Sequence, residues 1–161
     1  MANTQSMCTS FLGELMTATH NFGTAPIRAA STADTFKAAL YFTSATIDAS
    51  TTAYTTTGEV TNTSGTGYTA GGTTVTNATP PASTNSSATA GVGYWTPSAS
   101  FVWTALTVTT AFDTVLLYNS TQSNKAVSVH TFGSQTITAG TFTLTMPSNT
   151  TTTALLRLST T

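Results

Sequence analysis

Apolar runs and turn signals alternate most closely between residues 113 and 158, and this stretch constrains the fold more than any other. Residues 115–118 and 126–132 are apolar runs, and the polar segment 119–125 separates them. Two such runs joined by a short polar segment predict a β-hairpin.

The same stretch continues with two further apolar runs. Residues 141–146 alternate with a period of two and stop at Pro147, and another apolar run follows at 154–158. Four short strands with polar turns between them are typical of an antiparallel meander or Greek key, not of βαβ units.

More strands are predicted earlier in the chain. Residues 34–42 alternate, which places Phe36, Leu40 and Phe42 on a core face and leaves the opposite face for solvent or an interface. Residues 101–108 are apolar on both faces, which indicates a central or covered strand. A short strand is expected at 73–76, after the Gly-Gly turn.

The alternation of these strands also predicts which side chains form the core. They are the inward-facing large apolar residues of each strand: Phe36, Leu40, Phe42, Trp103, Leu106, Leu116, Val127, Val129, Phe142, Leu144 and Leu156.

One helix is predicted, because the apolar positions between Cys8 and Phe22 follow i, i+3, i+4 spacing. Thr makes up more than a quarter of the 161 residues, and this β-branched residue favours strands. We therefore expect one all-β domain over 1–161, an antiparallel β-sandwich of jelly-roll type. An N-terminal arm and short helix occupy 1–23, and long polar loops lie within 43–100.

The charge pattern excludes several partners. The net charge is −1, only 6 % of the residues are charged, and the four Lys and Arg residues are scattered. A nucleic-acid partner is therefore not expected. No apolar run approaches the roughly 18 residues that span a bilayer, so no membrane contact is expected either. The N-terminus lacks a secretion signal, which predicts synthesis in the cytoplasm.

No enzyme chemistry is predicted. The acidic residues Glu14, Asp34, Asp48, Glu59 and Asp113 do not cluster in the sequence, and each is interpreted as a cap, turn or solvated charge. The two histidines, His20 and His130, lack further ligands at metal spacing, and Cys8 lies on the apolar helix face. We expect no catalytic residue, no metal and no cofactor. Glycan hydrolysis is the least favoured alternative because it needs a carboxylate pair.

Residues 65–70 match the dinucleotide fingerprint GxGxxG/A only superficially. No strand-to-helix unit surrounds them, and no acid follows about 20 residues downstream. We interpret these glycines as turn positions with positive φ.

Several segments, in the same order along the chain, resemble a family of small virion structural proteins of short-tailed bacteriophages. They are MCTSF at 7–11, HNF at 20–22, DTFKAALY at 34–41, TAYTTTGEV at 52–60, GTGYTAGG at 65–72, LLYN at 116–119 and GTF at 140–142. The chain departs from relatives at 112–115, where many carry Arg-Gly-Ala, and in its polar insert at 80–87.

The resemblance implies a capsid cement or decoration protein on the exterior of the virion. Its expected partners are the major capsid protein and copies of itself, as a trimer in preference to a dimer. The alternative is a head-fibre or tail-associated protein that meets the host surface, in which Tyr94 and Trp95 contact glycans.

Segments with little apolar surface of their own are expected to contact these partners. The arm 1–6 and the loops 65–72 and 80–97 have this composition, and we expect neighbouring subunits to order them. The candidate interface residues are Met1, Ala2, Asn3, Thr4, Phe11, Tyr68, Pro80, Pro81, Tyr94 and Trp95.

Overall fold

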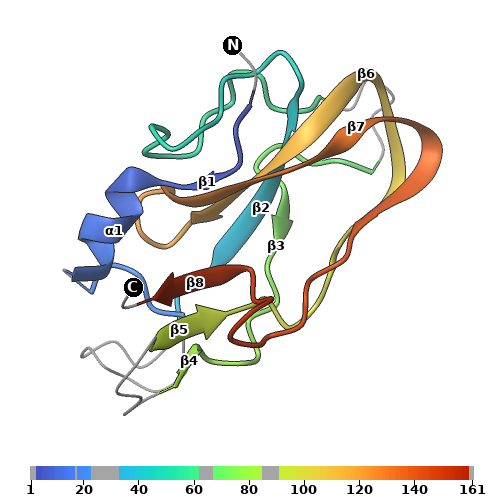
Figure 1. Cartoon of the computed structure of the whole chain (residues 1–161). Coiled ribbons are helices and arrows are strands. Elements are labelled where there is room, and N and C mark those ends of the chain that lie inside the picture. Colours follow the sequence, from blue (N-terminus) through green and yellow to red (C-terminus); the bar gives the residue numbers. More distant parts are fainter. Residues whose placement is uncertain (1–2, 17, 23–32, 62–66, 85–90, 160–161) are drawn as a thin grey trace.

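The computed structural model describes residues 3–16, 18–22, 33–61, 67–84 and 91–159. These residues form two antiparallel sheets and one short helix, which confirms the predicted all-β sandwich with an N-terminal helix (Figure 1). The larger sheet has the order β1-β7-β6-β2-β3, made of β1 (Ser6–Met7), β7 (Lys125–Leu144), β6 (Phe101–Asn119), β2 (Phe36–Phe42) and β3 (Thr73–Thr74). The smaller sheet has the order β4-β5-β8, made of β4 (Ala82–Ser83), β5 (Val92–Trp95) and β8 (Leu156–Ser159).

Two long strands replace four of the five short ones predicted between residues 101 and 158. β6 contains both predicted runs 101–108 and 115–118, and β7 contains 126–132 and most of 141–146. The predicted hairpin and its turn are confirmed, because β6 ends at Asn119 and β7 begins at Lys125. The four runs predicted to form a meander or Greek key are antiparallel but are not four successive strands of one sheet: 126–132 and 141–146 share β7, and the last run contributes β8 to the smaller sheet.

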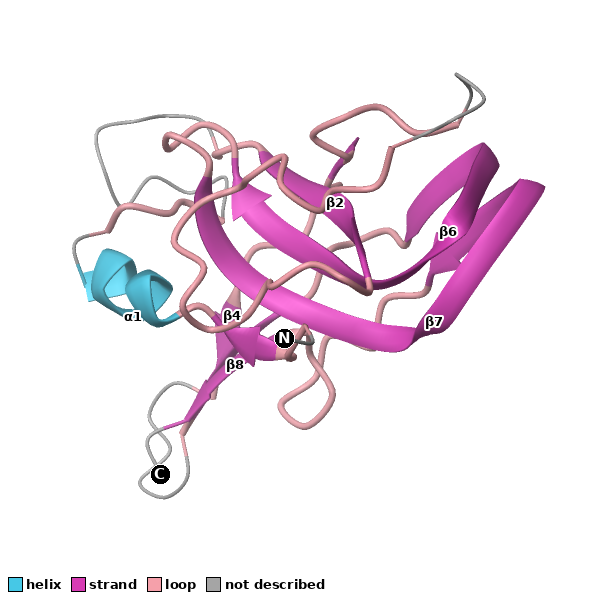
Figure 2. Cartoon of the chain, turned by 90° about the horizontal axis from the view of Figure 1, so that it is seen from above, coloured by secondary structure: helices cyan, strands magenta, loops and turns pink. Residues whose placement is uncertain are grey.

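β-Bulges let this hairpin bend without ending. The register of β6 against β7 shifts four times between Trp103 and Thr114, and Ala105 and Ala139 have positive φ values of 52° and 49°. A bulge bends its strand and increases the local twist. The part of the hairpin farthest from its turn therefore curves away from the rest of the large sheet (Figure 2).

β2 is buried on both faces, which corrects the prediction that its second face meets solvent or a partner. Ala39 and Tyr41 on that face are 0 % exposed. The polar stretch after β2 folds back over it: Val60 donates its backbone N–H to Leu40 at 2.8 Å, and the Tyr41 hydroxyl donates to the Thr55 carbonyl at 2.6 Å. The segment 43–61 thus covers this second face of β2.

The predicted core is confirmed. Phe42, Phe142 and Leu144 are half-buried and packed against the core, and the other residues of the predicted set are buried: Phe36, Leu40, Trp103, Leu106, Leu116, Val127, Val129 and Leu156.

The helix α1 (Thr9–Met16) begins where predicted but ends earlier. Ala18 has a positive φ of 53°, Ala18 N–H bonds to the Leu15 carbonyl at 3.1 Å, and Thr19 N–H bonds to the Glu14 carbonyl at 2.9 Å. This pair of bonds is a Schellman cap, which terminates helices. Phe22 lies beyond the cap and is buried in the core. No helix of the described residues is long and apolar enough to cross a membrane.

Candidate functional site

An apolar groove of about 160 Å³ lies between α1 and the small sheet. Phe11 and Leu15 of α1 form one side, and residues of β5 and β8 form the other, with Phe22 between them. No described residue that lines the groove is charged. Such a surface favours an apolar partner over water.

Aromatic rings make the base of the groove rigid. Phe22 stacks on Phe36 with a centroid separation of 4.4 Å and meets the edge of Trp95 at 4.8 Å. The Trp95 indole N–H donates to Asn77 Oδ1 at 2.9 Å and to the Thr79 carbonyl at 3.2 Å. Trp95 is 2 % exposed, so it fixes the shape of the groove while little of it reaches the surface.

β8 supplies the exposed apolar surface beside this base. Successive strand residues point to opposite faces, and Leu156 and Leu158 share the face that lines the groove. Leu156 is 8 % exposed, whereas Leu158 is 44 % exposed. Leu158 and Val102 are the large hydrophobic residues most exposed in the described part of the chain, and only Leu158 lines a groove of other apolar side chains.

The structure brings together four of the predicted interface residues. Phe11, Pro81, Tyr94 and Trp95 all line the groove, although they come from different parts of the sequence. Phe11 and Trp95 are almost fully buried by their own chain, which corrects the expectation that they are free contact residues. A partner in this groove would mainly contact Pro81, Tyr94 and Leu158, which are more exposed than Phe11 and Trp95.

The other candidates lie away from the groove. Asn3 bonds to the Phe42 carbonyl and to Asp113, and Thr4 N–H bonds to the Ile47 carbonyl. Pro80 is exposed, and Met1 and Ala2 lie outside the described residues. Backbone and amide bonds within the chain thus hold 3–6, and a role of neighbouring subunits in ordering the arm stays a prediction.

Tyr68 belongs to a buried network around Glu59. The Glu59 carboxylate accepts hydrogen bonds from the hydroxyls of Tyr68 and Tyr54 at 2.7 and 2.6 Å, and from Gly71 N–H at 2.7 Å. Burial and the bond to Glu59 raise the pKa of Tyr68 and of Tyr54. The loop 67–72 is therefore also held within its own chain, and Glu59, at 4 % exposure, is not the solvated or capping acid predicted.

Two glycines let this loop approach the sheet. Gly67 and Gly72 have φ values of 87° and 72°. The value at Gly67 confirms the predicted positive φ, whereas Gly65 lies outside the described residues. A Cβ on Gly72 would lie 1.9 Å from the Ala38 carbonyl oxygen, and one on Gly67 would lie 2.4 Å from that of Ala105. The GxGxxA pattern thus reflects close backbone packing.

A second polar network joins the helix end to the hairpin turn. His20 Nε2 lies 2.7 Å from Glu14 Oε2, and Lys125 Nζ donates to Glu14 Oε1 at 2.7 Å. Asn119 donates to His20 Nδ1 at 3.0 Å and to Asp34 at 2.8 Å. Glu14 and Asp34 are thus placed on one network, which nothing in their sequence spacing indicates.

The electrostatics of this network indicate a structural role. Burial lowers the pKa of His20 and outweighs the opposing effect of Glu14. Burial alone would raise the pKa of Glu14, but hydrogen bonds from Lys125 and His20 outweigh it, so the pKa of Glu14 lies below its ordinary value. Each polar side chain of the network has a partner from another element, so the network holds α1 against the hairpin.

Metal and thiol chemistry have little structural basis in the described residues. They contain no group of three or more His, Cys, Asp or Glu side chains placed to hold a metal ion. Cys8 is fully buried, and burial with the nearby charges of Glu14 and Asp48 raises its pKa to about 12. A thiol in this environment is poorly nucleophilic.

No family model matches the chain, and searches of curated proteins and of solved structures find no similar protein.

Proposed function

We propose that the chain is a non-enzymatic bacteriophage virion protein that decorates the head by binding the major capsid protein. The apolar groove with Leu158 at its rim carries this proposal, because it is an exposed apolar surface built on a rigid base. The resemblance of seven segments to small phage virion proteins supports the virion role. The groove is the surface through which we propose that the protein binds the head.

The groove favours a protein partner over a glycan. In a head fibre or tail protein, Tyr94 and Trp95 would form an aromatic platform for sugar rings, and such stacking needs open ring faces. Trp95 is 2 % exposed and its indole N–H is already bonded. An apolar segment of a capsid subunit fits the groove better, since it needs no polar partners there.

A decoration protein works through many identical contacts. Removing the exposed part of one Leu side chain from water contributes on the order of 1 kcal/mol, which is weak for a single contact. Repetition around a symmetric shell raises the combined strength of such contacts. Because none of the described residues that line the groove is charged, binding there should depend little on salt.

The test uses heads of the phage that encodes the chain, prepared without this protein. Purified protein is mixed with the heads, and bound protein is measured after sedimentation. Leu158→Glu should weaken binding by about tenfold or more, because a charge would have to be buried in the groove. Val102→Glu is the matched control, since Val102 is 46 % exposed but lies outside the groove.

Two outcomes would contradict the proposal. If both variants bind like the unchanged protein, the groove is not the docking site. Copy number separates the decoration role from the fibre role: a decoration protein should occur in roughly hundreds of copies per virion and a fibre protein in roughly tens. A low copy number at the tail would therefore favour the alternative.

A further inference from the structure

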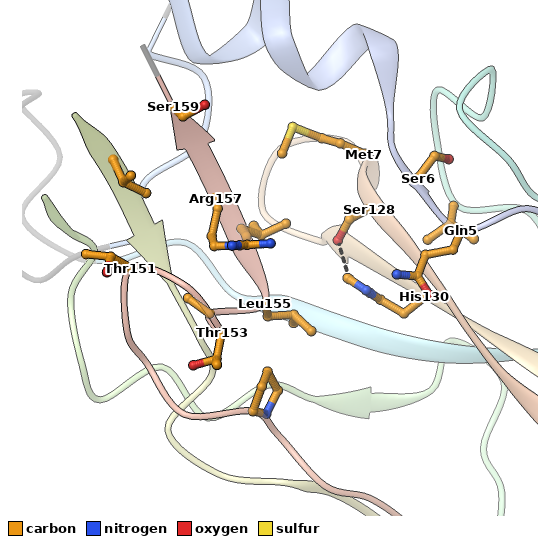
Figure 3. Close-up of a pocket in the computed structure, with 15 residues that line it drawn as sticks. Gln5, Ser6, Met7, Ser128, His130, Thr151, Thr153, Leu155, Arg157 and Ser159 are labelled. Atoms are coloured by element: carbon orange, nitrogen blue, oxygen red, sulfur yellow. Dashed lines mark hydrogen bonds between the residues drawn. The ribbon is translucent and has the colours of Figure 1, made fainter. Parts of the chain in front are cut away.

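A second, polar pocket of about 630 Å³ borders β8 and Val92 of β5 (Figure 3). Its other walls are β1 and β7 of the large sheet and the segment that precedes β8. Its lining is rich in hydroxyl, amide and imidazole groups, from Gln5, Ser6, Ser128, His130, Thr151 and Thr153. The pocket is thus suited to a polar ligand, unlike the groove.

Arg157 gives this pocket one positive charge. Strand alternation places Arg157 and Leu158 on opposite faces of β8; Arg157 lines the pocket and not the groove, and Figure 3 shows its guanidinium pointing toward Ser128 and His130. Among the described residues, no carboxylate lines the pocket and no Asp or Glu forms an ion pair with Arg157.

His130 adds hydrogen bonding but no charge near neutral pH. Burial lowers the pKa of His130 to about 4, and its Nε2 lies 2.8 Å from Ser128 Oγ. The pocket therefore offers a single guanidinium surrounded by neutral donors and acceptors. This charge matches a monoanion such as a carboxylate better than a phosphate, which carries nearly two negative charges at neutral pH.

The backbone of β8 indicates the shape of the ligand. β8 is the last strand of its sheet and pairs only with β5 among the described strands. β5 runs along one edge of β8, and the other edge, with which no described strand pairs, faces β1 and β7 across the pocket (Figure 3). An open edge of this kind accepts an additional extended strand.

We propose that an acidic segment of a partner polypeptide binds here in an extended conformation, pairing with the outer edge of β8 and placing a carboxylate on Arg157. A guanidinium holds a carboxylate through two parallel hydrogen bonds. The hydroxyls of Thr151, Thr153 and Ser159 surround the flanking positions and suit polar neighbours of the acid. The pocket shares Met7 and Leu156 with the groove, but the proposal does not depend on the virion role.

The test uses the full chain and a capped pentapeptide, Thr-Thr-Glu-Thr-Thr, titrated while backbone amide and Arg157 side-chain NMR signals are followed. We expect saturable shifts at β8 and at Arg157. Arg157→Gln should weaken binding by at least about tenfold, as expected for a lost charge-assisted pair. Lys37→Gln removes the same charge from β2, outside the pocket, and should bind like the unchanged protein.

Three results would overturn the inference. The first is equal binding of the matched peptide Thr-Thr-Gln-Thr-Thr, which would make the carboxylate irrelevant. The second is saturable binding of glucuronate at Arg157 without binding of the acidic peptide, which would assign the pocket to acidic sugars. The third is a dimer of the free protein that Arg157→Gln dissociates in sedimentation, which would make a second copy the occupant.

Discussion

The hydroxyl of Tyr68 donates to Glu59 Oε1 at 2.7 Å, and the oxygen of that hydroxyl accepts the backbone N–H of Leu40 at 3.0 Å. One side chain therefore satisfies a buried carboxylate and a strand N–H at once. The loop that carries Tyr68 is bound to β2 by this contact, without help from another molecule.

Tyr68→Phe should destabilise the protein by about 1–3 kcal/mol, because it leaves a buried N–H without an acceptor and removes one donor from Glu59. Denaturant unfolding measures this change. Tyr94→Phe is the control, since Tyr94 is half-buried at the groove and should change stability by less than about 0.5 kcal/mol. Equal effects of the two substitutions would contradict the role of the network.

Gly72→Ala should destabilise the protein by more than about 2 kcal/mol, because the backbone has φ 72° and the new Cβ would clash with the Ala38 carbonyl. Thermal unfolding measures the loss. Gly133→Ala is the matched control, because Gly133 does not have a positive φ and the atom nearest to the new Cβ would be 4.0 Å away. A tolerated Gly72→Ala would mean that the loop does not pack against β2 as described.

Stability should fall as the pH drops from 6.5 toward 4. Burial lowers the pKa of His130 from 6.5 to about 4, so in this window the unfolded chain binds a proton that the folded chain does not. The contribution is fully present above pH 6.5 and is lost as the pH falls, by up to roughly 3 kcal/mol. His20, whose pKa is also lowered, changes stability in the same direction.

The measurement is denaturant unfolding at several pH values across this window. His130→Gln keeps a polar side chain beside Ser128 but does not titrate, so it should flatten the pH dependence by the share that His130 contributes. An unchanged slope in this variant would show that His130 is not buried as a neutral imidazole.

Cys8 should resist alkylation by iodoacetamide in the folded protein. It is 0 % exposed and its pKa is raised to about 12, so little thiolate forms and the reagent has no access. Labelling should instead follow global unfolding as denaturant is added, and mass spectrometry measures it. Labelling of the native protein at the rate of a free thiol would show that the N-terminal segment opens locally.

Period-two alternation was enough to predict the strands and the inward-facing residues. Leu40, Leu116 and Val129 were assigned to the core from their phase alone, and all three are 0 % exposed. This works because the side-chain period of a strand is a local property of the backbone. The start of α1 was equally local, since it depends on a capping residue followed by apolar spacing.

The tertiary structure decided where strands continue and which polar groups meet. Alternation breaks at a bulge just as it does at a turn, so the continuity of β6 past Ala105 depends on its pairing with β7. The burial of Glu59 needed donors from Tyr54, Tyr68 and Gly71, and no local pattern predicts that these will converge.

The groove and the polar pocket also depend partly on the sequence alone and partly on the tertiary structure. The sequence by itself places Arg157 and Leu158 on opposite faces of a strand, because neighbouring residues alternate. Only the tertiary structure sets Leu158 beside Trp95 and Phe11 of the groove, and Arg157 opposite Ser128 and His130. Residues this far apart in the chain come together through packing of the two sheets and α1, which depends on the shape of the whole core and not on any local pattern.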